Sequence, residues 1–153
     1  MKFFETSKYY SLKKSIYINL RWIGIIGQMI SIYLVYFYFQ FRFDFIYSNI
    51  IIILGIFSNI YLTFIYKKTQ LSERSALIFL LIDIFQLGGL LYLTGGIINP
   101  FIIFLLIPSV FASSNLSFKT NFLIVAITTI IIIFLTFNAK TLPFPLNQHF
   151  HVD

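Results

Sequence analysis

The chain has 153 residues, of which 59% are hydrophobic and only 10% are charged. Soluble domains carry about 25% charged residues, and a mean hydropathy of +0.90 excludes an ordinary soluble fold and predicts a membrane protein. The net charge of +6 does not indicate a nucleic-acid partner, because the basic residues lie between apolar segments and form no single patch. The absence of cysteine excludes disulfides and thiolate chemistry in this chain.

Five apolar segments follow one another, each close to the roughly 20 residues that a membrane-spanning helix needs. They predict an all-α integral membrane protein, a bundle of five transmembrane helices within residues 20–137. Residues 1–19 mix Lys with apolar side chains, so they form either an amphipathic helix on the inner interface or a disordered basic leader. Residues 138–153 form an outer tail, after which the chain either finishes or has been cut before another span. The spans cover about 20–39, 47–66, 75–94, 100–115 and 120–137.

The basic residues set the predicted orientation. Nine of the eleven flank the first span or lie in the connections between spans two and three or four and five. By the positive-inside rule, these regions and the N-terminus are cytoplasmic, and the connection between spans three and four faces outward. The nine are Lys2, Lys8, Lys13, Lys14, Arg21, Lys67, Lys68, Arg74 and Lys119, and the other two are Arg42 and Lys140.

The outward connection reads LTGGIINPF, from Leu93 to Phe101. Gly95 and Gly96 can take the positive φ that ends a helix, and Asn99 followed by Pro100 is typical of a helix start. These residues therefore predict a tight turn in a helical hairpin without any ligand. The same turn also offers backbone and amide donors beside the ring of Phe101 at lipid depth, which suits a lipid-soluble molecule with carbonyl oxygens, such as a quinone.

The stretch GGIINPF resembles the GGxxNPF signature in the membrane domain of the RegB/PrrB family of redox-responsive sensor histidine kinases. The segments LRWIGIIGQ, LLYLTGG and LPFPLNQHFH also resemble parts of that domain. The resemblance implies that Gly95, Gly96, Asn99, Pro100 and Phe101 bind ubiquinone, whose redox state controls autophosphorylation. It further implies a homodimer in the bacterial inner membrane that signals to a cytoplasmic response regulator.

Members of that family continue beyond the matching region. They have a sixth span, a helix with the phospho-accepting histidine and an ATP-binding domain, and none of these is found in this sequence. The chain therefore resembles the sensory input part of such a kinase, without a catalytic motif of its own. The pair His149 and His151 in the tail offers only two nearby ligands, so no metal site is predicted.

Three polar side chains interrupt the apolar spans. Asp83 lies in the third span, roughly 10–12 Å from its inner end, and Gln86 follows one turn later on the same face. An intramembrane carboxylate indicates a functional site by default, with Arg21, Gln28 or Asn59 as a partner. Asp83, Gln86 and Gln28 could serve sensing or proton coupling, or could fix helix packing. A small transporter or channel subunit that uses Asp83 is the alternative function.

Span four contains a proline. Pro108 is expected to kink this helix, with the Ser109 hydroxyl available to satisfy a carbonyl that the proline leaves free.

Overall fold

The computed structural model describes residues 11–138, which form mainly long helices. Among these described residues, four helices are long and apolar enough to cross a membrane, and a shorter apolar stretch covers Pro100–Asn115. This confirms the predicted all-α bundle and a multi-pass membrane protein. The elements are β1 (Ser11–Lys13), α1 (Lys14–Tyr33), the π-helical η2 (Leu34–Tyr38), α2 (Phe45–Phe64), β2 (Gln70–Ser72), α3 (Glu73–Leu93), the 3-10 helices η3 (Gly96–Ile98) and η4 (Pro100–Leu106), α4 (Ile107–Asn115) and α5 (Phe118–Asn138).

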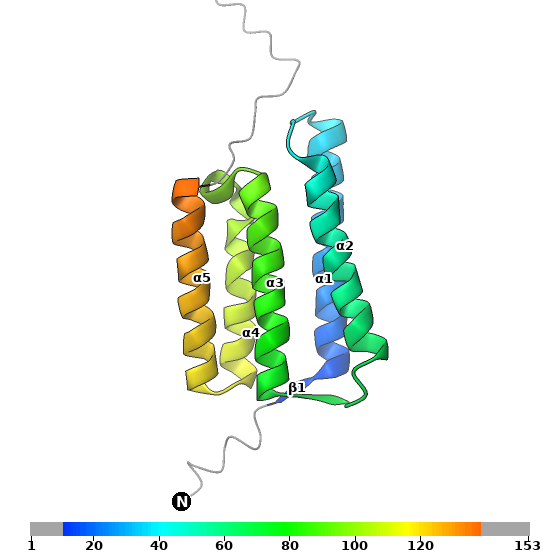
Figure 1. Cartoon of the computed structure of the whole chain (residues 1–153), viewed down its shortest axis with the longest axis vertical. Helices are drawn as coiled ribbons and strands as arrows, with labels where there is room; N and C mark the ends of the chain where they lie inside the picture. Colours follow the sequence, from blue (N-terminus) through cyan, green and yellow to red (C-terminus); the bar gives the residue numbers. More distant parts are fainter. Residues whose placement is uncertain (1–10, 139–153) are drawn as a thin grey trace, which may run out of the picture.

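Helix α3 lies between α2 and α5, while α1 packs on α2 and α4 packs on α5 (Figure 1). Consecutive helices run in opposite directions, so the connections between them lie at two opposite ends of the bundle (Figure 1). We call the end at β1 and β2 the basic end, and the end formed by residues 39–44 and 94–99 the tip end. The largest fully buried apolar side chains are Ile52, Leu62, Leu71, Leu80, Ile84, Leu91, Leu105, Ile124 and Leu135.

The outer surface of the bundle is apolar as well. Phe64, Phe85, Phe118 and Phe122 all leave more than 60% of their surface exposed, on helices whose other faces are packed. Such a surface is unfavourable in water and favourable against lipid chains. The hydrophobic pattern thus places these helices in a bilayer with apolar residues on both the packed and the lipid-facing sides.

Two contacts hold α1 against α2 at the basic end. Strand β1 pairs with β2 in an antiparallel ladder that sets Leu12 opposite Leu71. The Lys14 ammonium donates hydrogen bonds to the carbonyl of Tyr66 and, at 3.3 Å, to the carbonyl of Thr63. This places a positive charge at the C-terminus of α2, where the helix dipole stabilises it.

The first turn of α3 is fixed to the first turn of α5. Ser72 caps α3 by accepting a hydrogen bond from the backbone N–H of Ser75 at 3.3 Å. Glu73 Oε1 accepts hydrogen bonds from the Ser117 N–H at 3.0 Å, from the Thr120 hydroxyl at 2.6 Å and from the Ser117 hydroxyl. A carboxylate beside two helix N-termini is stabilised by both dipoles, so this contact holds the two helices together at the basic end.

The first helix differs most from its predicted bounds. It begins at Lys14 rather than near residue 20, and residues 11–19 are divided between β1 and α1. Arg21, expected to flank the first span, lies about 10 Å inside α1 at 1.5 Å per residue and is only 6% exposed. It is therefore not a loop charge, because its charge is compensated inside the bundle. Residues 1–10 of the predicted leader, and His149 and His151 in the tail, lie outside the described residues.

Span four is irregular from its start. Residues Pro100–Leu106 form a 3-10 helix, and the α-helix begins only at Ile107, where the Ile107 N–H bonds the carbonyl of Phe104. Pro108 comes directly after this bond and cannot donate one itself, so it stands at the change of helix type. The expectation for Ser109 was wrong, because its buried hydroxyl has no hydrogen-bond partner in the described part of the chain.

Candidate functional site

The turn between α3 and η4 depends on its two glycines. Gly95 has a φ of 109° and Gly96 a φ of 60°, two consecutive residues in the left-handed region. Residues with a side chain rarely adopt this conformation, so the glycines allow the chain to leave α3 and reverse. The predicted helix stop is confirmed.

The Asn99 side chain fixes the other half of the turn. Its carbonyl oxygen accepts a hydrogen bond from the Phe101 N–H at 2.9 Å, which makes Asn99 the N-cap of η4, with Pro100 in the first turn. Its amide nitrogen donates to Thr94 O at 3.0 Å and to Thr94 Oγ1 at 2.9 Å. The Thr94 hydroxyl in turn donates to the Leu90 carbonyl at 2.7 Å. Asn99 is 8% exposed, and the predicted helix start is confirmed.

An ion pair between the buried Arg21 and the partly buried Asp83 lies deeper in the bundle. Arg21 on α1 donates from Nε to Asp83 Oδ1 on α3 at 2.9 Å, and its Nη2 lies 2.8 Å from the same oxygen. The Tyr17 hydroxyl donates to Asp83 Oδ2, and Arg21 Nη2 also donates to the Ser58 hydroxyl on α2 at 2.8 Å. The Arg21 guanidinium lies 5.5 Å from the ring centres of Tyr17 and Phe79. Of the partners expected for Asp83, the structure selects Arg21, and the pair joins α1, α2 and α3.

The two glutamines form a second polar contact between α1 and α3. Gln86 Nε2 donates to Gln28 Oε1 at 3.0 Å. On the other side, the Gln86 amide lies against Gly55 of α2, where an added Cβ would come within 2.3 Å of Gln86 Nε2. Gly55 therefore leaves the space that Gln86 occupies, and α2 holds this amide toward α1.

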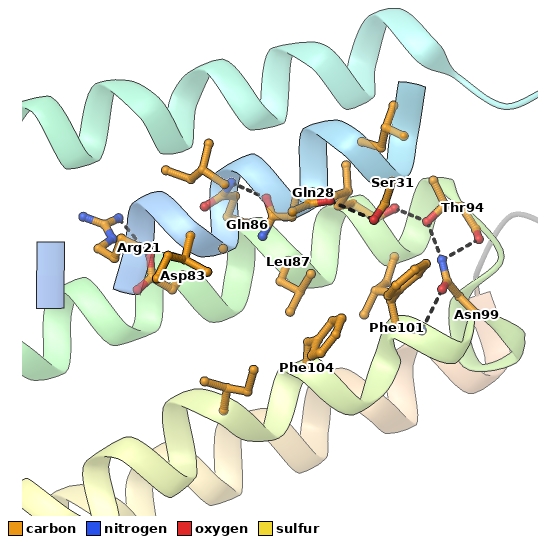
Figure 2. A pocket seen from close by; sticks show the side chains of 18 of the residues that line it. Arg21, Gln28, Ser31, Asp83, Gln86, Leu87, Thr94, Asn99, Phe101 and Phe104 are labelled. Atoms are coloured by element: carbon orange, nitrogen blue, oxygen red, sulfur yellow. Dashed lines mark hydrogen bonds and ion pairs between the residues drawn. The ribbon is translucent and has the colours of Figure 1, made fainter. Parts of the chain in front are cut away.

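One cleft is lined by Asn99, by the Arg21–Asp83 pair and by the two glutamines. It has a volume of about 650 Å³ and lies between α1 on one side and η4 and α4 on the other, with α3 forming its floor. Its lining includes Asn99, Pro100 and Phe101 at the tip end and Tyr17 at the other end, where the Tyr17 ring stacks on Phe111 with centroids 5.9 Å apart. Figure 2 shows polar side chains in a row along the cleft, namely Arg21, Asp83, Gln86, Gln28, Ser31, Thr94 and Asn99.

The opposite wall of the cleft is aromatic. The rings of Phe101 and Phe104 stack with centroids 5.6 Å apart, and both face the polar row across the cleft (Figure 2). Ile23, Phe104 and Ile107 on the rim are between 44% and 68% exposed, so the cleft reaches the lipid-facing surface. Apolar lining with a few polar groups suits a hydrophobic ligand that carries hydrogen-bonding atoms.

The structure thus unites two predicted sets of residues. Asn99, Pro100 and Phe101 line the same cleft as Asp83, Gln86 and Gln28, whereas Gly95 and Gly96 shape the turn and are not among its lining residues. Sequence reasoning missed other members of the lining, among them Thr94, Tyr17 and Phe104. Helical spacing could have found Thr94, which follows Gln86 by eight residues and shares its face, but Tyr17 and Phe104 carried no separate signal.

These observations define a multi-pass membrane protein with a cleft that opens toward lipid. The chain is 32% identical over 111 residues to the sensor histidine kinase RegB of Cereibacter sphaeroides, and this match covers 72% of the chain. It covers 24% of RegB, so the chain spans about a quarter of the length of that relative. No family model matches the chain, and no solved structure matches it.

The similarity to RegB confirms the predicted RegB/PrrB-like relationship. It supports the interpretation of this chain as the sensory membrane domain of a histidine kinase.

Proposed function

We propose that this chain is the membrane-embedded input domain of a redox-sensing two-component histidine kinase, and that it binds ubiquinone in the cleft beside the GGxxNPF loop. Bound quinone would regulate autophosphorylation by the kinase. The proposal includes a homodimer of the complete protein in the bacterial inner membrane and a cytoplasmic response regulator as its partner. The observation that carries it is the single cleft shared by the loop and the intramembrane polar residues.

The chemistry of the cleft fits a quinone. A quinone head group is a flat ring with carbonyl oxygens, and its isoprenoid tail is wholly apolar. The stacked rings of Phe101 and Phe104 give the head group an aromatic wall, while the row on α1 and α3 supplies amide groups. The cleft volume of about 650 Å³ lies within the range of roughly 300–1,000 Å³ that is usual for small-molecule sites.

The position of the cleft also suggests how binding is transmitted. One wall is α1, which packs on α2, and the other is η4 and α4, of which α4 packs on α5. A ring held between the walls favours one separation of these two groups of helices over another. Ligand binding shifts the equilibrium between two such helix arrangements only by the difference in its affinity for them. In the proposed mechanism, oxidised and reduced quinone differ in this affinity.

The test is a titration of the purified chain in lipid nanodiscs with a short-tailed ubiquinone, followed by quenching of Trp22 fluorescence or by equilibrium partition. We expect saturable binding that Phe101→Ala weakens by about three- to tenfold, since an aromatic contact contributes roughly 0.5–1.5 kcal/mol. Phe118→Ala is the matched control, because Phe118 is 83% exposed and lies outside the cleft. Absence of saturable binding by the folded wild-type chain would reject the proposal.

A transporter or channel that uses Asp83 gains no support from the described residues. Both carboxylate oxygens of Asp83 accept hydrogen bonds from Arg21 or Tyr17, and the stacked rings of Tyr17 and Phe111 line the same end of the cleft. We therefore propose no transport function.

A further inference from the structure

We infer that the amide pair Gln28–Gln86, in the middle of the cleft, binds the quinone head group, and that Asn99 holds the turn in shape without contacting the ligand. This inference rests on the proposed function and moves the polar contact to a different part of the cleft. Gln86 precedes Thr94 by eight residues, so the inferred contact lies about 12 Å deeper along α3 than the turn.

The side-chain donors of the turn are already in use. The Asn99 amide group has two hydrogens, and its nitrogen donates to the carbonyl and to the hydroxyl oxygen of Thr94. The Thr94 hydroxyl hydrogen is donated to Leu90 O. A quinone carbonyl is only an acceptor and needs a donor. To bind it, Asn99 would have to break a hydrogen bond that maintains the turn.

The glutamine pair has unused hydrogen-bonding groups. Within the described chain, Gln28 Nε2 donates to no acceptor, and Gln86 Nε2 uses one of its two hydrogens on Gln28 Oε1. Gln86 Oε1 likewise accepts no hydrogen bond from any described residue. The pair therefore offers donors to the carbonyl of an oxidised quinone and an acceptor to the hydroxyl of a reduced one. This is the only polar pair of the row shown in Figure 2 that offers both.

The structure leaves room beside this pair. Gly24 and Gly27 line the cleft on α1 next to Gln28, and a Cβ at either position would meet nothing within 4 Å. A flat ring can approach the helix backbone here more closely than at a residue with a side chain. Leu87 on α3 and Phe104 across the cleft complete the apolar surroundings (Figure 2).

The deeper end of the cleft offers no such contact. Both oxygens of Asp83 accept hydrogen bonds, and as acceptors they would repel a quinone carbonyl. The unpaired nitrogen of Arg21, Nη1, has no exposed surface in the cleft, and the guanidinium lies against two aromatic rings. Among the described side chains of the row, the glutamine pair is thus the position where a head group finds a donor.

The experiment measures the binding of a short-tailed ubiquinone, oxidised and reduced, to the full chain in nanodiscs. Gln28→Met and Gln86→Met keep the length and volume of the side chains but remove the amides. Each is expected to raise the Kd by about two- to tenfold, as the loss of one or two hydrogen bonds does. Gly24→Leu, which fills the space beside Gln28, is expected to abolish binding. Gln70→Met, in β2 at the basic end, is the matched control.

The outcomes separate the inference from the proposed function. One outcome overturns the inference and leaves the proposed function standing. In that outcome the wild-type chain binds quinone, both Met variants have a Kd within twofold of the wild-type Kd, and Asn99→Ala loses binding at unchanged helical content. If the wild-type chain binds no quinone, both the inference and the proposed function fail.

Photolabelling with an azidoquinone is an independent test. Labelled peptides that contain Gln28 or Gln86 support the inference, and labels confined to residues 95–101 contradict it.

Discussion

The Arg21–Asp83 ion pair allows a sharp prediction about stability. Asp83→Leu removes the carboxylate that accepts hydrogen bonds from Arg21 Nε and from the Tyr17 hydroxyl and that pairs with Arg21 Nη2. The Arg21 side chain, which is 3% exposed, then keeps only the Ser58 hydroxyl as a hydrogen-bond acceptor. Removing one partner of a buried pair costs about 3–5 kcal/mol because the other charge stays uncompensated. Arg21→Met should cost less, because the Asp83 side chain is 22% exposed and keeps the Tyr17 hydroxyl as a donor. The double variant should be closer to the wild type than either single variant, since no buried charge is left unpaired.

The assay is reversible unfolding of the purified chain in mixed micelles of a mild detergent and dodecyl sulfate, followed by circular dichroism. The four proteins form a double-mutant cycle, and residues in contact show coupling energies of about 0.5–3 kcal/mol. A coupling near zero, or an Asp83→Leu variant within about 0.5 kcal/mol of the wild type, which is the range of ordinary surface substitutions, would refute the view that the ion pair supports the bundle. Asn49→Leu is a suitable control for the loss of a polar group, because Asn49 bonds Tyr33 and Phe45 outside this network.

Three further predictions concern the ends of the bundle. Gly96→Ala places a side chain at a φ of 60° and should lower the unfolding free energy by about 1–2 kcal/mol, measured in the same micelle assay. An unchanged value would mean that the turn relaxes. Asn99→Ala removes the η4 cap and should cost about 0.5–2 kcal/mol, with faster amide hydrogen exchange at Phe101 as its local sign. Exchange at the wild-type rate would contradict the cap. Glu73→Ala loses three hydrogen bonds to α5 and should increase protease cleavage near Ser117, whereas Glu73→Gln keeps an acceptor and should be cleaved less. Equal cleavage of both variants would show that the contact contributes little.

Hydropathy was enough to predict the bundle because a long apolar segment in lipid forms a helix. In a bilayer each segment must satisfy its own backbone groups, so the apolar runs could only be helices. The bounds of α2, α3 and α5 follow from where these runs stop, and they agree with the prediction to within about two residues at each end, which is the usual uncertainty of helix ends. The turn was predictable for a similar reason, since Gly95, Gly96 and Asn99 each have a local preference that does not depend on distant residues.

The start of α1 and the cleft were not predictable in this way. The positive-inside rule counts Arg21 as a flanking charge, and the sequence offers it only as one of three possible partners for Asp83, which lies 62 residues away. Hydropathy scores a charge without regard to such a partner. The cleft depends equally on tertiary packing, since Gln28, Gln86 and Phe101 come from three different elements. Helical spacing predicts that Gln86 and Thr94 lie on one face of α3. It does not predict which helix packs against that face.

The exposed apolar rim of the cleft has a consequence for how occupancy is determined. Ile23, Phe104 and Ile107 border the opening on the surface that faces lipid chains, so a molecule reaches the cleft sideways, by diffusing within the bilayer. The relevant concentration of such a molecule is its mole fraction among lipids, and its solubility in water does not enter. At a given mole fraction in the membrane, occupancy is then independent of cell volume. Affinities for this cleft are therefore comparable between membranes only when they are expressed per lipid.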